Sequence, residues 1–227
     1  MLPMLDLTHT NASSRHHGVL TSGYLARIHE LNREYLQVLL AEPRVPRFGC
    51  LPPSLLDRLE ALSPTARDAM AECPYALYSL RFDDAGFWEA LGEQWDAQSL
   101  GQRPARSAPS AARSLCEVAL FLAWHVAVCN PLATGLLYGM PPGVAQGLAR
   151  RPLRWLQRVA ADYPDLMMPR WPTNRCFWPN LIDAAGGGDA QRLRMARLLG
   201  SQLIAAELDA AQARSARRRM MLARATS

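Results

Sequence analysis

The side chains of this chain best suited to binding chemistry are clustered arginines. Arg150, Arg151, Arg154 and Arg158 follow one another closely, and a helix is expected over about 152–162. The three- and four-residue spacing places Arg151, Arg154 and Arg158 on one face of that helix. A row of guanidinium groups can neutralise phosphates, so this row is a candidate DNA-binding site. A solvated arginine face is an equally common alternative.

A second cluster of arginines lies near the C-terminus. It contains Arg214, Arg217, Arg218 and Arg219, and no acidic residue follows Asp209. A basic end of this kind can bind nucleic acid, an acidic protein or an anionic membrane, or it can be a solvated, frayed helix end. We include these four arginines among the predicted DNA-binding residues.

Charge is distributed unevenly along the chain. All 25 basic residues are arginines; residues 1–100 carry a net charge of −5, and residues 101–227 carry +10. The two halves are therefore expected to face different partners, with the acidic half binding protein and the basic half binding DNA.

No motif for catalysis, a cofactor or a metal emerges. The absence of lysine excludes a phosphate-binding P-loop, and no recognisable nucleophile or carboxylate motif adjoins the histidines. The five cysteines include no Cys-x-x-Cys pair, which argues against zinc and disulfides and favours buried free thiols in a reducing cytoplasm. We therefore predict a non-enzymatic protein with no cofactor and no metal. The cysteines are Cys50, Cys73, Cys116, Cys129 and Cys176.

The elements that must position these residues are helices. The hydrophobic pattern predicts an all-α fold with two tandem, diverged helical modules and a long C-terminal helix. The expected divisions are a disordered leader (1–20), a first module (21–97), a linker (98–113), a second module (114–185), and a C-terminal helix with a basic tail (186–227).

The first expected helix carries a regular apolar seam. Its residues recur at four- and three-residue spacing, so they can pack against another helix of the same chain or of a second copy. We list them as candidate partner-binding residues. They are Tyr24, Ile28, Leu31, Tyr35 and Val38.

An internal repeat is the strongest pattern in the chain. The turn Gly49–Pro53 recurs at Gly139–Pro142, and Phe87-Trp88 recurs at Phe177-Trp178. Between them, Arg81-Phe82 aligns with Arg170-Trp171. Two copies are too few for a solenoid and suggest a fused pair that reproduces a homodimer within one chain.

Neither a membrane span nor a secretory signal is expected. The longest apolar run, Val118–Val128, has 11 residues and contains His125, whereas a span needs about 20 residues. Residues 1–20 contain no basic start followed by an apolar run. We therefore expect a soluble, cytoplasmic protein that does not bind membranes.

The first module resembles the D subunit of the flagellar master transcription activator (FlhD). The resemblance covers about 60 residues in short motifs that follow the same order as in that family. They are Ile28–Leu36, Arg47-Phe48-Gly49, Leu59–Ser63, Ala71-Glu72 and Leu80–Asp83.

This resemblance implies an all-α fold, interlaced dimerisation and action as a DNA-binding co-activator beside a C-type subunit. It also implies that the turn at Arg47 and Phe48 contacts DNA or a protein partner. The leading hypothesis is a transcriptional regulator of this type that binds DNA through its arginine-rich second module. The alternative is a non-enzymatic adaptor or protein-interaction module of a secretion or flagellar apparatus.

Overall fold

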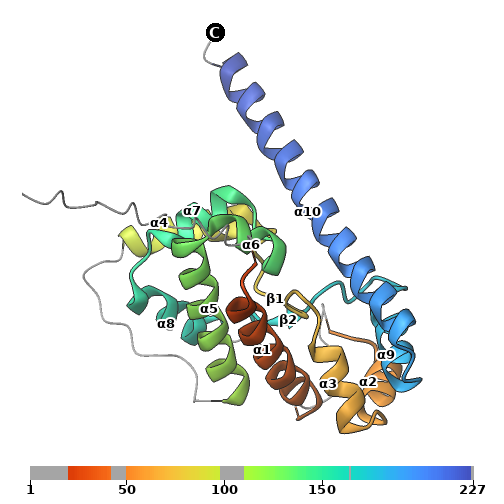
Figure 1. The fold of residues 1–227 in the computed structure, drawn as a ribbon. Coiled ribbons are helices and arrows are strands. Elements are labelled where there is room, and N and C mark those ends of the chain that lie inside the picture. The colour runs from red at the N-terminus through yellow and green to blue at the C-terminus, as the bar shows by residue number, and fades with distance from the viewer. Residues whose placement is uncertain (1–19, 42–49, 98–109, 164, 226–227) are drawn as a thin grey trace, which may run out of the picture.

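The structure, a computed structural model, describes residues 20–41, 50–97, 110–163 and 165–225. Residues 1–19 of the expected leader, together with Arg47 and Phe48, lie outside the described residues. The described part contains ten helices and two two-residue strands, which confirms the all-α class (Figure 1). The elements are α1 (Ser22–Ala41), α2 (Pro53–Glu60), α3 (Pro64–Ala71), β1 (Tyr78–Ser79), α4 (Ala85–Ala97), α5 (Ala111–Cys129), α6 (Pro131–Tyr138), α7 (Pro142–Ala149), α8 (Leu153–Asp162), β2 (Met168–Pro169), α9 (Phe177–Gly186) and α10 (Ala190–Ala225).

Short polar and proline-containing turns set the starts of these helices. The side chain of Ser63 accepts a hydrogen bond from Ala66 N at the start of α3, as Ser110 does from Arg113 N at the start of α5. Residues 98–109 of the expected linker lie outside the described residues, and α5 begins at Ala111. Each cap satisfies a backbone N–H that has no partner inside the helix.

The order of elements recurs along the chain. The series α2, α3, β1, α4 is followed later by α7, α8, β2, α9. In both series the strand leads into a turn with one residue at positive φ, namely Arg81 (56°) and Trp171 (50°). Asp84 and Asn174 then each accept a hydrogen bond from the backbone N–H three residues later.

These turns correct the predicted alignment by one residue. The turn places Trp171, and not Arg170, at the position of Arg81, because the second series has one extra residue between the start of its short helix and its strand. The displaced Arg170 takes the position of Leu80, and both side chains are buried. Turn geometry, which short sequence motifs do not reveal, decides this correspondence.

The two series are interlaced. β1 and β2 pair antiparallel, with Tyr78 opposite Pro169 and Ser79 opposite Met168. Beyond this crossing, α4 packs against α7, whereas α9 packs against α2 and α3. Each series therefore packs its last helix against the other series, and the resulting core is continuous across both.

The apolar helix α5 lies at the centre of the bundle. It contacts α1, α6, α7 and α8, and seven of its residues are buried. Among the described residues, α5 alone is long and apolar enough to cross a membrane by length and composition. In this fold its apolar surface packs against neighbouring helices.

The C-terminal helix α10 covers one side of the bundle and extends beyond it (Figure 1). Its first five turns pack mainly against α9 and α6, and Ala196, Ile204 and Ala211 are buried there. Past Ala211 the described side chains are exposed except for the half-buried Ala216. The predicted long C-terminal helix is thus confirmed, and contact with the body continues only along its first part.

Candidate nucleic-acid interface

The predicted arginine row on α8 is partly used inside the fold. The Arg151 guanidinium donates to Asp96 Oδ1 over 2.8 Å and to the carbonyl oxygen of Gly92 over 3.4 Å. Both acceptors belong to α4, which packs on α7 just before Arg151. Arg151 thus holds the crossed-over helix α4, and its charge is already paired with a carboxylate.

The other arginines of the row differ in whether their guanidinium groups are paired with a carboxylate. Arg158 donates to Asp162 Oδ2 over 3.1 Å on the same helix, and both side chains are about 26% exposed. Arg154 is exposed, with its guanidinium carbon 5.7 Å from the ring centre of Trp95. Arg150 is exposed at the end of α7, and no ion pair is observed for it among the described residues. Only Arg150 and Arg154 therefore offer cationic groups without a carboxylate partner.

The charge difference between the two halves is partly neutralised within the molecule. Arg197 of α10 lies 3.2 Å from Glu72, and Arg218 of α10 lies 3.0 Å from Glu89. Like Arg151 with Asp96, both pairs join an arginine of the second half to an acid of the first half. Linear charge counting missed these pairs because the crossing of α4 and α9, which brings the halves together, is not visible in the sequence.

The basic end of α10 keeps most of its charge unpaired. We define this surface by Arg214, Arg217, Arg218, Arg219 and Arg224, all of which are exposed. Arg218 is paired with Glu89, whereas no ion pair is observed for the other four within the part of the chain that the structure describes. Helical spacing puts all of them except Arg219 on one side of α10. This surface is the best candidate for contact with a polyanion.

The apolar seam of α1 serves the protein's own core. Ile28, Leu31 and Tyr35 are at most 4% exposed, and α1 packs against α3 and α5. Tyr24 and Val38 are half-buried at the edges of this contact. In this fold, therefore, the central seam residues are not available to a separate partner, because α3 and α5 of the same chain already cover them.

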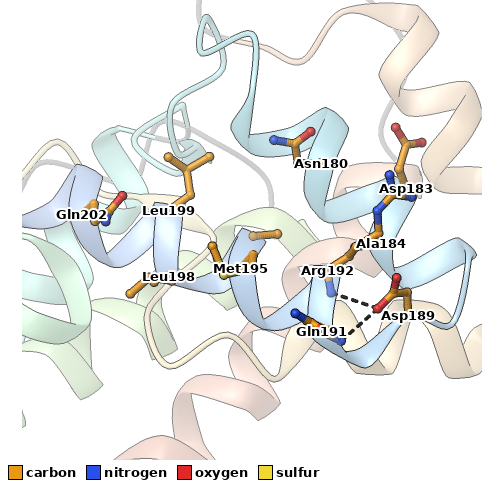
Figure 2. Close-up of a pocket in the computed structure, with 11 residues that line it drawn as sticks. Asn180, Asp183, Ala184, Asp189, Gln191, Arg192, Met195, Leu198, Leu199 and Gln202 are labelled. Carbon is orange, nitrogen blue, oxygen red and sulfur yellow. Dashed lines mark hydrogen bonds between the residues drawn. The ribbon is translucent and has the colours of Figure 1, made fainter.

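A groove separates the outer faces of α9 and α10 (Figure 2). It has a volume of about 660 Å³ and combines apolar side chains such as Met195 and Leu198 with polar ones such as Gln202 and Asn180. Asp189 closes one end by accepting hydrogen bonds from the backbone N–H groups of Gln191 and Arg192. Its carboxylate caps α10.

Two of the five thiols are buried, and the exposed Cys129 lies 3.8 Å from His125 Nδ1, one turn earlier on α5. Cys73 and Cys116 are buried, and burial raises the pKa of each thiol to about 12, which disfavours the nucleophilic thiolate. The remaining cysteines, Cys50, Cys129 and Cys176, are exposed, which corrects the expectation that all five thiols are buried. No group of three or more potential metal ligands occurs among residues 20–41, 50–97, 110–163 and 165–225.

The eight predicted DNA-binding arginines are held by different elements. Arg151 and Arg218 both pair with acids of α4, Asp96 and Glu89, whereas the end of α10 extends beyond the body (Figure 1). Comparisons with protein families, curated proteins and solved structures find no match for this chain. The residues and their surroundings are therefore the basis for a functional proposal.

Proposed function

We propose that this chain is a non-enzymatic transcriptional regulator of the flagellar-activator type, and that it binds DNA phosphates through the basic end of α10. The exposed and mostly unpaired arginines of that surface carry the proposal. The resemblance of residues 28–83 to the D subunit of the flagellar activator supports a regulatory role. Action together with a C-type protein partner follows from the same resemblance.

The geometry of α10 suits contact with a charged backbone. A helix that projects from a folded body can lie along a groove or across phosphates without a rearrangement of the core. Phosphate contacts of this kind give affinity and orientation, whereas sequence is read by contacts with base edges. We therefore assign the basic end of α10 to backbone binding, with Arg150 and Arg154 as a second, smaller basic site.

Salt dependence of DNA binding tests this proposal. Each neutralised phosphate contributes about −0.9 to the slope of log K against log salt between about 50 and 200 mM. A variant with Arg214, Arg217, Arg219 and Arg224 changed to alanine should lose affinity and flatten that slope by about 3 to 4.

The matched control changes Arg192 and Arg194 to alanine, because both are exposed arginines at the opposite end of the same helix. For this control variant, the slope of log K against log salt should stay close to that of the unaltered protein. The proposal fails if the protein binds no DNA at low salt, with or without a C-type partner, or if the two variants lose affinity equally.

An adaptor of a secretion or flagellar apparatus is the second candidate function. Large exposed apolar side chains favour it, notably Leu132 at 72%, Met220 at 58% and Met221 at 72% exposure. Such side chains occur at protein interfaces. Co-purification of one protein at fixed stoichiometry, with an absorbance ratio that excludes nucleic acid, would favour this candidate over DNA binding.

A further inference from the structure

We propose that His125 and Cys129 of α5 form half of a zinc site, and that a second copy of this chain supplies the other half. Both side chains are exposed, and Cys129 Sγ lies 3.8 Å from His125 Nδ1 and 3.9 Å from His125 Nε2. A thiolate and an imidazole are the ligands that most structural zinc sites use. This inference goes beyond DNA binding and does not depend on it.

The two side chains are one helical turn apart, which suits binding to a single ion. Residues four positions apart lie on the same face of a helix, and two histidines at this spacing hold zinc in the His-Glu-x-x-His motif. In a tetrahedral site the usual zinc–sulfur and zinc–nitrogen distances place the two ligand atoms about 3.6 Å apart. The observed separation of 3.8 Å therefore requires only a small adjustment of the side chains to receive the ion.

One copy of the chain supplies too few ligands for a structural site. Such sites hold zinc with four protein ligands, and no group of three or more potential ligands occurs in the part of the chain that the structure describes. Two copies related by a two-fold axis beside the pair would bring together two imidazoles and two thiolates. The second copy thus completes a tetrahedral set that one chain only begins.

The surface around the pair is suited to contact with its own copy. Val118 lies on the same stripe of α5, seven residues before His125, and it is 51% exposed. Leu132 follows Cys129 by three residues at the start of α6, which packs against α5, and it is 72% exposed. No aspartate, glutamate, arginine or lysine occurs from Val118 to Ala149. In a two-fold contact this surface would meet itself, so the absence of charge avoids repulsion between like groups.

The charge of the completed site matches this uncharged surface. Two cysteine thiolates balance the two positive charges of Zn²⁺, and the histidines bind it as neutral imidazoles. The assembled site is therefore electrically neutral and can be buried between two apolar surfaces without an unpaired charge. A strongly acidic or basic partner would have no opposite charge to contact here, which favours a second copy as the occupant.

The other histidines do not complete the site within the described structure. His29 belongs to α1, and its Nε2 atom is buried. His9, His16 and His17 lie outside the described residues. Ligation by one of these three would give a monomer with one ion per chain, whereas a second copy gives a dimer with one ion per two chains. The ratio of metal to protein therefore separates the two arrangements.

Metal titration of the full chain tests the proposal. The protein is freed of metal with a chelator, kept reduced, and titrated with Co²⁺ and, separately, with Zn²⁺. We expect saturation at one ion per two chains and a doubling of the mass measured by light scattering. Co²⁺ should show the visible bands of a tetrahedral ion and a thiolate-to-metal charge-transfer band. Zn²⁺, whose filled d shell gives no such bands, should displace Co²⁺ and abolish them.

Substitutions of the ligands locate the metal. Cys129→Ser and, independently, His125→Ala should each abolish the cobalt bands and the metal-dependent doubling of mass. Cys176→Ser, at another exposed cysteine, is the matched control and should keep both. Zn²⁺ should also protect the Cys129 thiol from a thiol reagent, while Cys176 of the same protein continues to react.

Substitutions of the surrounding surface locate the contact. Leu132→Asp places a like charge on both copies and should prevent the doubling of mass. Leu198→Asp, at a leucine of α10 that is 49% exposed, should leave it unchanged. Circular dichroism of every variant shows that it is folded, and the exposed positions of the ligands keep their substitutions out of the core.

Three results would overturn the proposal. The first is binding of Co²⁺ by the folded, reduced chain that is no stronger than binding by Cys129→Ser. The second is saturation at one ion per chain in a monomer. The third is an equal doubling of mass without metal and in both ligand variants, which would make the surface an apolar contact only. Because the DNA test in "Proposed function" uses the arginines of α10, the two proposals can fail separately.

Discussion

Arg170 and Glu207 form an ion pair in which the guanidinium is almost completely buried. Arg170 is 4% exposed and donates to Glu207 Oε2 over 2.7 Å, while the indole of Trp171 donates to the other carboxylate oxygen over 2.6 Å. The arginine directly follows β2, and the carboxylate belongs to α10. This cluster therefore fastens the long helix to the crossing point of the two series.

Removal of the carboxylate should destabilise the protein strongly. Glu207→Ala leaves the Arg170 charge buried without a counter-ion, and breaking a buried pair in this way costs about 3 to 5 kcal/mol. Glu207→Gln keeps a hydrogen-bond acceptor and should cost less. Urea unfolding followed by circular dichroism measures the difference. Asp209→Ala, at an exposed position on the same helix, is the control and should change the unfolding free energy little.

The buried side chain of Asn32 should also contribute strongly to the free energy of unfolding, because it fastens α1 to the first series. Asn32 Nδ2 donates to the carbonyl oxygens of Ala71 and Tyr75, and its Oδ1 accepts from Leu77 N over 2.8 Å. Asn32→Ala leaves these backbone groups unsatisfied inside the core. Since each such group costs about 1 to 3 kcal/mol, we expect a loss of about 3 kcal/mol or more in unfolding free energy.

The matched control for Asn32 is Gln37→Ala, an exposed amide on the same helix. It tests whether loss of a polar side chain from α1 is itself destabilising. Equal unfolding free energies for Asn32→Ala and the unaltered protein would contradict the assigned role. A loss confined to Asn32→Ala would assign the effect to the buried hydrogen bonds.

Much of the fold could be predicted because its helices have clear boundaries in the sequence. Ser63-Pro64 and Asn130-Pro131 begin helices where capping chemistry predicts them. The recurrence of Phe-Trp at the start of a helix also pointed to the repeat. The exchange of α4 and α9 between the series could not be predicted from the sequence. The apolar faces of both helices would be buried equally well if each helix packed against its own series.

The candidate site was less predictable for a related reason. Arg158 pairs with Asp162 four residues later on α8, a spacing that the sequence contains, whereas Asp96, the partner of Arg151, is defined only by the tertiary structure. The structural role of Asn32 is not visible in the sequence, because a polar residue inside an apolar helical stripe resembles a break in the apolar pattern. Its role requires knowledge of which backbone segment crosses α1.

The distribution of thiols gives a direct check on the fold. Cys50, Cys129 and Cys176 are exposed, whereas Cys73 and Cys116 are buried with pKa values raised to about 12. A thiol reagent at neutral pH should therefore modify three cysteines rapidly in the native protein and all five after denaturation. Rapid modification of Cys73 or Cys116 under native conditions, identified by mass spectrometry, would contradict the packing around α3 or α5.

Stability near neutral pH should depend on His29 of α1. Burial lowers the pKa of His29 below its ordinary value of 6.5; Glu72 opposes the shift, and Arg197 and Arg33 add to it. The folded state therefore favours the neutral imidazole, and its Nε2 atom is buried without a hydrogen-bond partner. As the pH falls through 6.5, the unfolded chain takes up a proton more readily than the folded chain, so stability decreases.

The variant His29→Gln isolates this effect because glutamine is polar, of similar length and does not titrate. Unfolding free energies of both proteins at about pH 7.5 and 5.5, on either side of the ordinary histidine pKa, give a double difference that cancels the other titrating groups. We expect the unaltered protein to lose more stability than His29→Gln over this interval. A protein that instead gains stability relative to the variant on acidification would show that Glu72 dominates the surroundings of His29, and that the imidazole is charged in the folded state.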